Sequence, residues 1–341
     1  MCDSRPGREQ AVNSRRRGRI GGRPARLLCV FLLCGLVLCG CGKQEAQTVR
    51  IGSLKGPTSL GILFLMREAE QDRAEYPYEF HMAKGADELL PLLVKGELDI
   101  ALVPANVAAA LYRKTEGGVS VIDINTLGVL YLVTGSEDIE SAADLKGRTI
   151  CLTGKGTTPE ASLKYILDQN GLEPDDYKLE YKSEAAEVAA LLARDPAVIG
   201  LLPQPFATAA LMQNANLRIA LDMNAQWEAL QGEEAGSMVT GVTVVRNDFL
   251  AEHRDTVETF LEHHAHSVAA VNGDPDIGAA LAVEAGIVAK EEIAREAIPQ
   301  CNLVCITGEE MKDALSAYLK VLAGFQAELV GGELPGEDFY Y

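Results

Sequence analysis

The sequence predicts an α/β fold made of two similar halves and a helical region after them. Three observations indicate this. From about residue 48, short apolar runs alternate with helical patterns, which is typical of βαβ units with parallel strands. The alternation pauses near residue 133 and restarts near residue 149. Residues 248–325 then show an almost entirely helical pattern.

The first half, residues 48–132, contains three strand–helix repeats followed by two further strands. The predicted strands are Thr48–Ser53, Tyr78–Met82, Leu98–Val103, Val119–Asp123 and Leu127–Val133. The predicted helices are Thr58–Ala74, Ala86–Lys95 and Ala105–Arg113. Each helix follows a strand directly, so we expect the loops between them at the carboxyl edge of a sheet, where open α/β sheets bind ligands.

The second half, residues 135–238, repeats the same order. Its predicted strands are Thr149–Leu152, Tyr177–Tyr181, Val198–Leu202 and Leu217–Asp222. Its predicted helices are Pro159–Gln169, Glu184–Arg194 and Phe206–Asn214. A last strand, Val242–Arg246, leads into the helical region.

Two strand-to-helix turns, one in each half, have similar composition. They read Ile51-Gly52-Ser53-Leu54-Lys55-Gly56-Pro57-Thr58 and Ile150-Cys151-Leu152-Thr153-Gly154-Lys155-Gly156-Thr157-Thr158-Pro159. Glycine permits a tight backbone, threonine can cap a helix, and proline suits its first turn. Such a helix start presents free backbone N–H groups to a ligand. Three more strand-end loops are Val103-Pro104-Ala105-Asn106, Leu202-Pro203-Gln204-Pro205-Phe206 and Ser237-Met238-Val239-Thr240-Gly241, which are either ordinary turns or the lining of one cleft.

Catalytic motifs are missing from these loops. Lys155 is followed by Gly156 and position 149 is Thr, so the second turn is not a Walker phosphate loop. The sequence has no Gly-x-Ser-x-Gly elbow and no evident Cys–His nucleophile pair. We therefore predict no catalytic residues and no cofactor.

The histidines and cysteines give no convincing metal site in the sequence. His263, His264 and His266 follow Glu262 on a predicted amphipathic helix, and we assign them to its solvated face rather than to a metal. Cys301 and Cys305 flank an extended segment, so they would lie roughly 13 Å apart, too far for a disulfide. No further ligand near them in sequence completes a zinc site, so we assign them a structural role.

The N-terminus has the composition of an export signal. Residues 1–26 contain eight Arg, and an uncharged run of twelve residues, Leu27–Leu38, follows. This run is shorter than the ~20 residues that a membrane-spanning helix needs. It ends in Leu38-Cys39-Gly40-Cys41-Gly42, which resembles the lipobox of bacterial lipoproteins with Cys41 as the lipidated residue. The alternatives are a secretory signal without a lipid or a permanent anchor helix.

The charge balance excludes one class of partner. The chain has 31 basic and 49 acidic residues, a net charge of −18. Residues 1–40 hold eight of the basic and two of the acidic residues, so the remainder has 23 and 47 and a net charge near −24. Nucleic-acid binding needs a basic surface, so we exclude it.

Four segments together resemble the substrate-binding lipoproteins of bacterial ABC importers, of the nitrate, sulfonate/taurine and thiamine-pyrimidine type. The segments are Ile51–Thr58, Gly96-Glu97-Leu98-Asp99-Ile100-Ala101, Asp144-Leu145-Lys146-Gly147-Arg148 and Gly241-Val242-Thr243-Val244-Val245-Arg246. The resemblance covers about residues 48–341. It implies a two-lobed type II periplasmic-binding fold, each lobe a mostly parallel sheet flanked by helices, with a helical C-terminal tail.

The resemblance also implies how the chain is divided. Residues 1–40 would be the signal peptide and 41–47 a tether. Lobe 1 would comprise 48–133 plus 240–341, and lobe 2 134–239, with crossings near Val133-Thr134 and Thr240-Gly241. A small solute would bind between the lobes of a monomer held at the membrane by its lipid only. The closed form would dock on a permease with its ATPase.

The resemblance implies that the ligand contacts come from the strand-end loops and the crossings. The expected residues are Ser53, Lys55, Gly56, Pro57, Thr58, Pro104, Ala105, Asn106, Thr134, Gly154, Lys155, Gly156, Thr157, Thr158, Pro203, Gln204 and Thr240. Members of the family often have an acidic residue before Pro-Phe-Ala, where this chain has Gln204, which weakens the case for a cationic ligand contact there.

The ligand class stays open at this stage. Lys55 and Lys155 could hold a carboxylate, sulfonate or phosphate at helix N-termini, or they could face solvent. Tyr131, Phe206 and Trp227 could stack on a heterocycle, or they could belong to the core. Two other functions remain as alternatives: a lipid-tethered sensor, and an enzyme on the same fold of the menaquinone-precursor type, against which the lipobox speaks.

Overall fold

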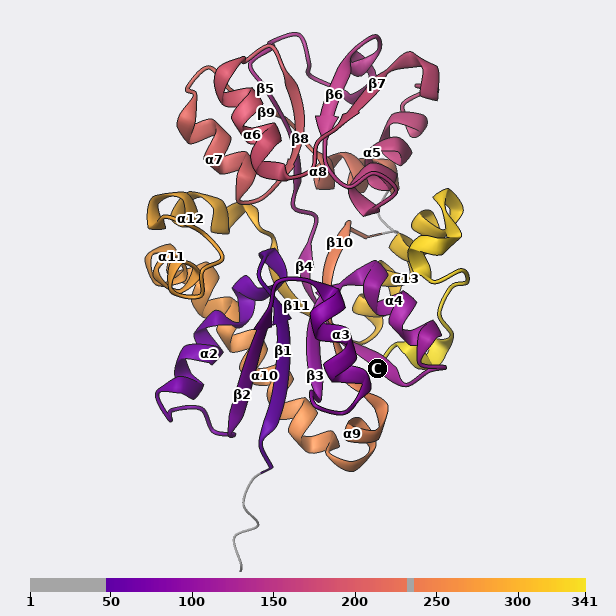
Figure 1. The fold of residues 1–341 in the computed structure, drawn as a ribbon. Helices are drawn as coiled ribbons and strands as arrows, with labels where there is room; N and C mark the ends of the chain where they lie inside the picture. The colour runs from indigo at the N-terminus through magenta and orange to yellow at the C-terminus, as the bar shows by residue number, and fades with distance from the viewer. Residues whose placement is uncertain (1–46, 232–235) are drawn as a thin grey trace, which may run out of the picture. The chain divides into compact units, whose positions relative to one another are not determined.

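A computed structural model describes residues 47–231 and 236–341, and Gln47–Tyr341 form one compact unit (Figure 1). The predicted signal peptide, the lipidation residue Cys41 and all but the last residue of the tether lie outside the described residues. None of the helices in the described ranges combines the length and the hydrophobicity needed to cross a bilayer.

The first sheet has six strands in the order β11-β4-β10-β3-β1-β2. Their bounds are β1 Val49–Leu54, β2 Tyr78–Ala83, β3 Ile100–Pro104, β4 Val119–Leu127, β10 Val239–Arg246 and β11 Leu303–Ile306. β1 runs parallel to β2 and β3, whereas β10 runs antiparallel to β3 and β4. The last strand, β11, is antiparallel to β4 at the edge.

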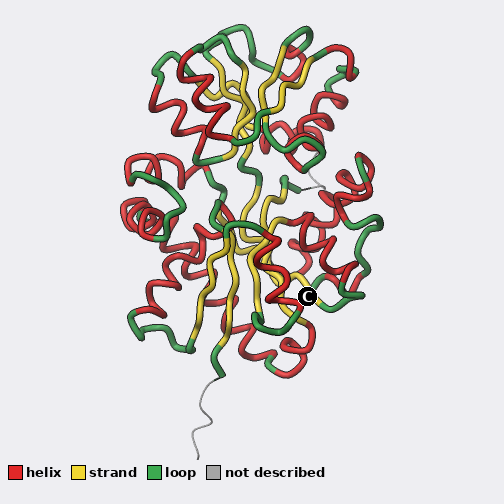
Figure 2. Tube along the Cα trace, in the orientation of Figure 1, coloured by secondary structure: helices red, strands yellow, loops and turns green. Residues whose placement is uncertain are grey.

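The second sheet has five strands in the order β7-β6-β8-β5-β9. Their bounds are β5 Leu130–Thr134, β6 Thr149–Leu152, β7 Lys178–Tyr181, β8 Ile199–Pro203 and β9 Arg218–Asp222. β6 is parallel to β7 and β8, and β5 is antiparallel to β8 and β9. Figure 2 shows the strands in two separate groups, each flanked by helices.

Helices of the first sheet's part of the chain come from both ends of the sequence. They are η1 Pro57–Ile62, α2 Leu63–Glu70, α3 Ala86–Val94, α4 Ala105–Lys114, α9 Asn247–Glu252, α10 Arg254–Gly273, α11 Pro275–Glu284, α12 Glu291–Ala297, η5 Ile298–Gln300, α13 Gly308–Phe325, η6 Ala327–Val330 and η7 Glu337–Phe339. The second sheet carries η2 Ala142–Leu145, α5 Thr158–Gln169, η3 Pro174–Asp176, α6 Ala185–Arg194, α7 Phe206–Gln213 and α8 Met223–Gln231.

The predicted α/β fold with two halves is confirmed, but the sheets are mixed rather than mostly parallel. The antiparallel neighbours arise where the chain passes between the sheets. β4 and β5 are consecutive strands in different sheets, and β10 returns to the middle of the first sheet. Apolar periodicity identifies a strand but does not give its direction, so the sequence pattern did not show this.

The passages between the sheets differ slightly from the predicted crossings. β5 already belongs to the second sheet, so the first passage is at Gly128 and Val129 instead of Val133-Thr134. The return falls between Gln231, at the end of α8, and Val239, at the start of β10, just before the predicted Thr240-Gly241. The strand predicted at Leu127–Val133 is therefore divided between two sheets.

Three further elements differ from prediction. The helix expected over Thr58–Ala74 begins as the 3₁₀ helix η1 and ends at Glu70. The helix α8 follows β9 directly and was not predicted. The region expected to be almost entirely helical contains the strand β11, where the extended segment around Cys305 pairs with β4.

The largest apolar cluster takes residues from both sheets and their helices. Trp227 of α8 packs against Tyr165 of α5 and Tyr318 of α13, with ring centroids 4.8 and 5.3 Å away. All but Tyr165 are nearly inaccessible to solvent. Tyr131 is also buried, and its hydroxyl donates to the carbonyl of Gln300 over 2.7 Å. Trp227 and Tyr131 are therefore core residues that join the two parts, and neither is free to stack on a ligand in this conformation.

Candidate functional site

The loop after β1 is held by hydrogen bonds between its own residues. Ser53 and Ser59 are buried and their hydroxyls share a short hydrogen bond, while the Ser59 hydroxyl also donates to the carbonyl of Leu54. These bonds hold the predicted residues Lys55, Gly56 and Pro57 in the turn that opens η1. Thr58 at the start of η1 is buried, so burial and internal hydrogen bonds together hold this loop in one conformation.

A buried glycine brings the second passage against this loop. A Cβ at Gly241 would collide with the side chains of Asn125 on β4 and Thr58 on η1. In β10, Gly241 pairs with Pro104, which places the adjacent Thr240 beside the start of α4. The predicted residues Thr58, Pro104 and Thr240 are thus brought together. Asn125 was missed because it lies within an apolar strand and has no motif around it.

The loop before α5 is occupied by its own side chains. Gly154 and Gly156 have φ of +75° and +72°, which glycine adopts without strain. The backbone N–H of Gly156 donates to Oε2 of Glu160 over 2.6 Å, and the Thr157 hydroxyl donates to the carbonyl of Gly154. Glu160 is buried and forms an ion pair with Lys164. A carboxylate of this chain therefore occupies the helix start where an anionic ligand was expected.

The two lysines expected to hold an anion have other neighbours. Nζ of Lys155 lies 5.5 Å from the ring centroid of Tyr181, as in a cation–π contact. Nζ of Lys55 lies beside Gly286, which follows α11. Both lysines are exposed, so neither is fixed toward a shared binding point.

Gln204 lies in the loop after β8, before α7. Its side-chain Oε1 accepts the backbone N–H of Thr208 over 3.3 Å. The backbone N–H of Gln204 donates to the carbonyl of Val129 in the first passage. The side chain is buried, and its amide Nε2 has no hydrogen-bond partner among the described residues. Gln204 therefore combines a place beside the passage with an unused donor.

Thr134 is the predicted site residue that lies away from the others. Leu130 pairs with Pro203 and Val133 with Gly200, so β5 runs antiparallel to β8 and Thr134 lies at the opposite edge of the second sheet from Gln204. Its hydroxyl bonds to the carbonyl of Pro196 over 3.4 Å. Thr134 was expected at a crossing between the sheets, but the crossing lies before β5, so Thr134 is not beside it.

One cavity is lined by helices that flank the first sheet and by a loop of the second sheet. It has a volume of about 830 Å³ and runs between α3 and α4, with Leu90, Val94 and Leu111 among its apolar lining. Asn106, in the first turn of α4, and Gly156 and Thr157, in the loop before α5, also line it. The remaining predicted residues do not line this cavity.

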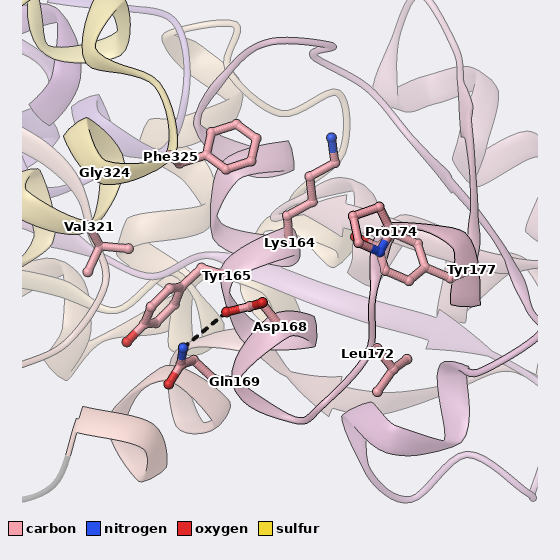
Figure 3. Close-up of a pocket in the computed structure, with 10 residues that line it drawn as sticks. All are labelled: Lys164, Tyr165, Asp168, Gln169, Leu172, Pro174, Tyr177, Val321, Gly324 and Phe325. Atoms are coloured by element: carbon pink, nitrogen blue, oxygen red, sulfur yellow. Dashed lines mark hydrogen bonds between the residues drawn. The ribbon is translucent and has the colours of Figure 1, made fainter.

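A second cavity of about 410 Å³ lies outside the predicted site. It is formed by α5, η3 and the end of α13, and Figure 3 shows its lining side chains. Lys164, Leu172, Tyr177 and Phe325 are among them, and none of the predicted ligand residues is.

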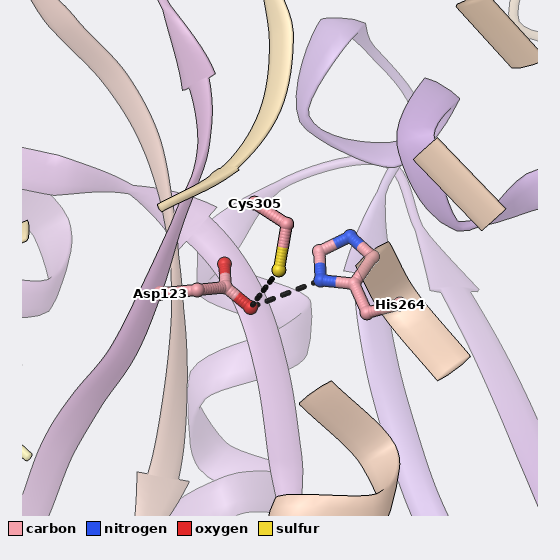
Figure 4. Close-up of side chains that lie close together, drawn as sticks. All are labelled: Asp123, His264 and Cys305. Atoms are coloured by element: carbon pink, nitrogen blue, oxygen red, sulfur yellow. Dashed lines mark hydrogen bonds and ion pairs between the residues drawn. The ribbon is translucent and has the colours of Figure 1, made fainter. Parts of the chain in front are cut away.

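The three histidines of α10 do not all face solvent as expected. His266 is exposed, but His264 is fully buried and its Nδ1 lies 2.9 Å from Oδ2 of Asp123 (Figure 4). The prediction of a solvated face is therefore wrong for His264. The helix α10 turns this position toward the first sheet, because Phe260, His264 and Val268 recur every four residues on its buried face.

Comparisons with known proteins support the fold and the resemblance. Residues 119–277 match the family model described as NMT1/THI5 like. No curated protein matches the sequence significantly.

Solved structures match over most of the chain. An ABC transporter structure from Parabacteroides distasonis has a TM-score of 0.71 and 24% identity, covering 86% of this chain and 98% of that one. The periplasmic aliphatic sulphonate binding protein SsuA from Escherichia coli has a TM-score of 0.66 and 15% identity, covering 86% of this chain and 90% of that one. The periplasmic nitrate-binding protein NrtA from Synechocystis PCC 6803 has a TM-score of 0.54 and 14% identity, covering 86% of this chain and 83% of that one.

Proposed function

We propose that this chain, which matches the NMT1/THI5-like model and has the fold of ABC-transporter solute-binding proteins, captures a small solute and delivers it to an ABC importer. The observation that carries the proposal is the shared cavity of about 830 Å³, lined by Asn106 from one sheet and Gly156 and Thr157 from the other. Its volume is typical of small-molecule sites. Its charged lining residues, Asp87, Lys95, Lys114 and Glu328, balance in sign.

The division into lobes is part of this proposal. We assign residues 48–127 and 239–341 to one lobe and 130–231 to the other, in agreement with the strand membership of the two sheets. Hinge closure about the two passages would trap the solute.

We further propose a neutral or cationic solute with an apolar body. The helix start at Gly156 already holds the carboxylate of Glu160, and Lys155 lies over Tyr181. The chain carries a net charge of −18, which repels a distant anion. The sulphonate and nitrate of the similar proteins are therefore poorer candidates than an uncharged compound.

Export and lipid anchoring at Cys41 complete the proposal. The lipobox-like segment supports the anchor. The lipid would keep the binding domain near the permease and so raise its effective concentration there.

A thermal-shift screen tests the binding function. The panel contains sulfonates, nitrate, pyrimidines, flavins and small carboxylates, together with neutral and cationic apolar compounds. A ligand at about 100 times its Kd stabilises by about 2.7 kcal/mol. Asn106→Ala and Thr157→Ala should each weaken a hit, while Ser316→Ala, on α13 and not among the lining residues, should not. Hits confined to anions would refute the proposed solute class, and full affinity in both cavity variants would refute this site.

A further inference from the structure

Three side chains that are far apart in the sequence converge where α10 packs against the first sheet. They are Asp123 on β4, His264 on α10 and Cys305 on β11 (Figure 4). Asp123 and His264 are fully buried, and Cys305 is partly exposed. One candidate ligand atom from each lies within 4.8 Å of the other two.

The distances between these atoms approach those of a metal site. Oδ2 of Asp123 lies 2.9 Å from Nδ1 of His264 and 4.0 Å from Sγ of Cys305. In a tetrahedral zinc site, bonds of roughly 2.0–2.3 Å place neighbouring ligand atoms about 3.3–3.8 Å apart. To bind one ion, the Asp123–His264 pair would have to open and the Asp123–Cys305 pair to close, each by a few tenths of an ångström.

The contacts that the trio makes now are ones that an ion could replace or keep. Sγ of Cys305 makes only long contacts, to Asp123 and to the carbonyl of Leu261 at 3.9 Å. His264 faces the trio with Nδ1, whose hydrogen bond to Asp123 the ion would replace. The other oxygen of Asp123 accepts the Thr243 hydroxyl over 2.7 Å, which fixes the carboxylate as an outer hydrogen bond does for a metal ligand.

We propose that Asp123, His264 and Cys305 bind a transition-metal ion of the Zn²⁺ type. The combination of one nitrogen, one sulfur and one oxygen donor suits Zn²⁺ and disfavours Ca²⁺ and Mg²⁺, which prefer oxygen ligands. Three protein ligands leave a fourth position for water, reached from the partly exposed Cys305 side.

The ion would join β11 to the centre of the first sheet. β11 pairs with β4 only at Leu303 and Ile306, with an irregular register between them. Bridging Cys305 to β4 and α10 would hold this edge strand in place, so metal binding should stabilise the protein independently of the solute.

Co²⁺ titration of the full chain tests the proposal, because a thiolate bound to Co²⁺ gives a near-ultraviolet charge-transfer band. The wild type should show the band together with visible bands of tetrahedral intensity, and Zn²⁺ should displace them. Cys305→Ser should remove the band and Asp123→Asn should weaken binding at least tenfold. Cys301→Ser is the matched control, since its thiol donates to the carbonyl of Ala297 over 3.2 Å, outside the trio.

The readout is the difference between wild type and Cys305→Ser at equal Co²⁺, because the full chain also contains Cys2, Cys29, Cys34, Cys39 and Cys41. Circular dichroism verifies that each variant folds, and Zn²⁺ should raise the melting midpoint of wild type and Cys301→Ser only. An unchanged spectrum in Cys305→Ser, no band in the wild type, or loss of the band in Cys301→Ser would each overturn the site.

Discussion

Asn302 donates a hydrogen bond of 2.6 Å from its side-chain amide to the carbonyl of Gly128, the residue at which the chain leaves the first sheet. The carbonyl of Asn302 also accepts the N–H of Leu127 over 3.0 Å. On its other side, Gly128 has no room for a side chain because Asn224 lies against it. Asn224 in turn accepts the N–H of Met238 over 3.0 Å, in the second passage. The two passages are therefore fixed by the same small group of residues.

The backbone at Asn302 gives a first prediction. Its φ of +47° lies in the left-handed region, so Asn302→Ala should lose the hydrogen bond to Gly128 and also acquire backbone strain. Asn302→Gly loses only the hydrogen bond. We expect the alanine variant to unfold at lower urea, with roughly 1–2 kcal/mol less stability than the glycine variant. Equal stability of the two variants would show that the backbone conformation is not limiting.

Asp99 gives a second prediction. This buried carboxylate accepts hydrogen bonds from Nε and Nη2 of Arg50 over 2.9 and 2.6 Å, and from the Arg50 backbone N–H. Asp99→Asn should cost roughly 2–4 kcal/mol of stability, because it breaks a mostly buried pair.

Asp99 precedes β3, at the edge opposite Pro104, so its loss should leave ligand affinity unchanged in the folded protein. Asp138→Asn is the control: it removes an exposed pair with Arg148, which solvent screens, so it should change stability much less. A larger loss in Asp138→Asn than in Asp99→Asn would contradict this assignment.

Glu160 predicts a pH dependence. Burial acts to raise the pKa of this carboxyl, but hydrogen bonds from Lys164, Gly156 and Tyr181 outweigh burial and lower it below 4.5. A lowered pKa means that the carboxylate stabilises the fold above about pH 4.5, and that this contribution is lost as pH falls through the lowered pKa. Glu160→Gln should therefore be about 1–2 kcal/mol less stable than wild type at pH 7, with the difference shrinking in acid. Urea unfolding across pH 3–7 measures it, and a gap independent of pH would contradict the role of the charge.

Trp227, the one tryptophan of the chain, predicts a graded packing effect. Trp227→Ala should cost roughly 3–5 kcal/mol, because a large side chain is removed between Tyr165 and Tyr318. Trp227→Phe keeps a ring there and removes an indole N–H that has no partner among the described residues, so it should cost much less. Chemical denaturation followed by circular dichroism compares them, and equal losses would mean that the ring contacts contribute little.

Cys41 predicts a difference in location. In a bacterial expression host, wild-type protein should incorporate labelled fatty acid and fractionate with membranes, whereas Cys41→Ser should do neither. Cys39→Ser is the matched control, since it changes the neighbouring cysteine and keeps the lipidated position. Membrane association of an unlabelled Cys41→Ser protein would contradict the lipid anchor.

The strands and helices of the two halves could be predicted because each has a clear apolar period and turn residues at its ends. β11 is the instructive exception. Only four residues long, it lies at a sheet edge with one buried residue, Leu303, so its pattern is too short to stand out from a helical region. The mixed sheet order could not be predicted either, because β10 lies between β3 and β4 in the sheet but follows them by more than a hundred residues in the chain.

The candidate site was predictable in part for the same reason. The loops at Thr58, Asn106 and Thr157 follow parallel strands, and the position of such loops depends on local order alone. Whether Lys155 is free depends on Tyr181, and whether the start of α5 is open depends on Glu160. His264 was misplaced because its burial depends on Asp123, which lies 141 residues away.

The place of β10 also has a consequence for the order of synthesis. β3 and β4 emerge from the ribosome first, but each pairs with β10 and not with the other. Until residue 246 has been made, both strands have an open edge, and all five strands of the second sheet appear in the meantime. Open strand edges are prone to wrong pairing. The second sheet can therefore be complete before the first, although the first sheet starts earlier in the chain.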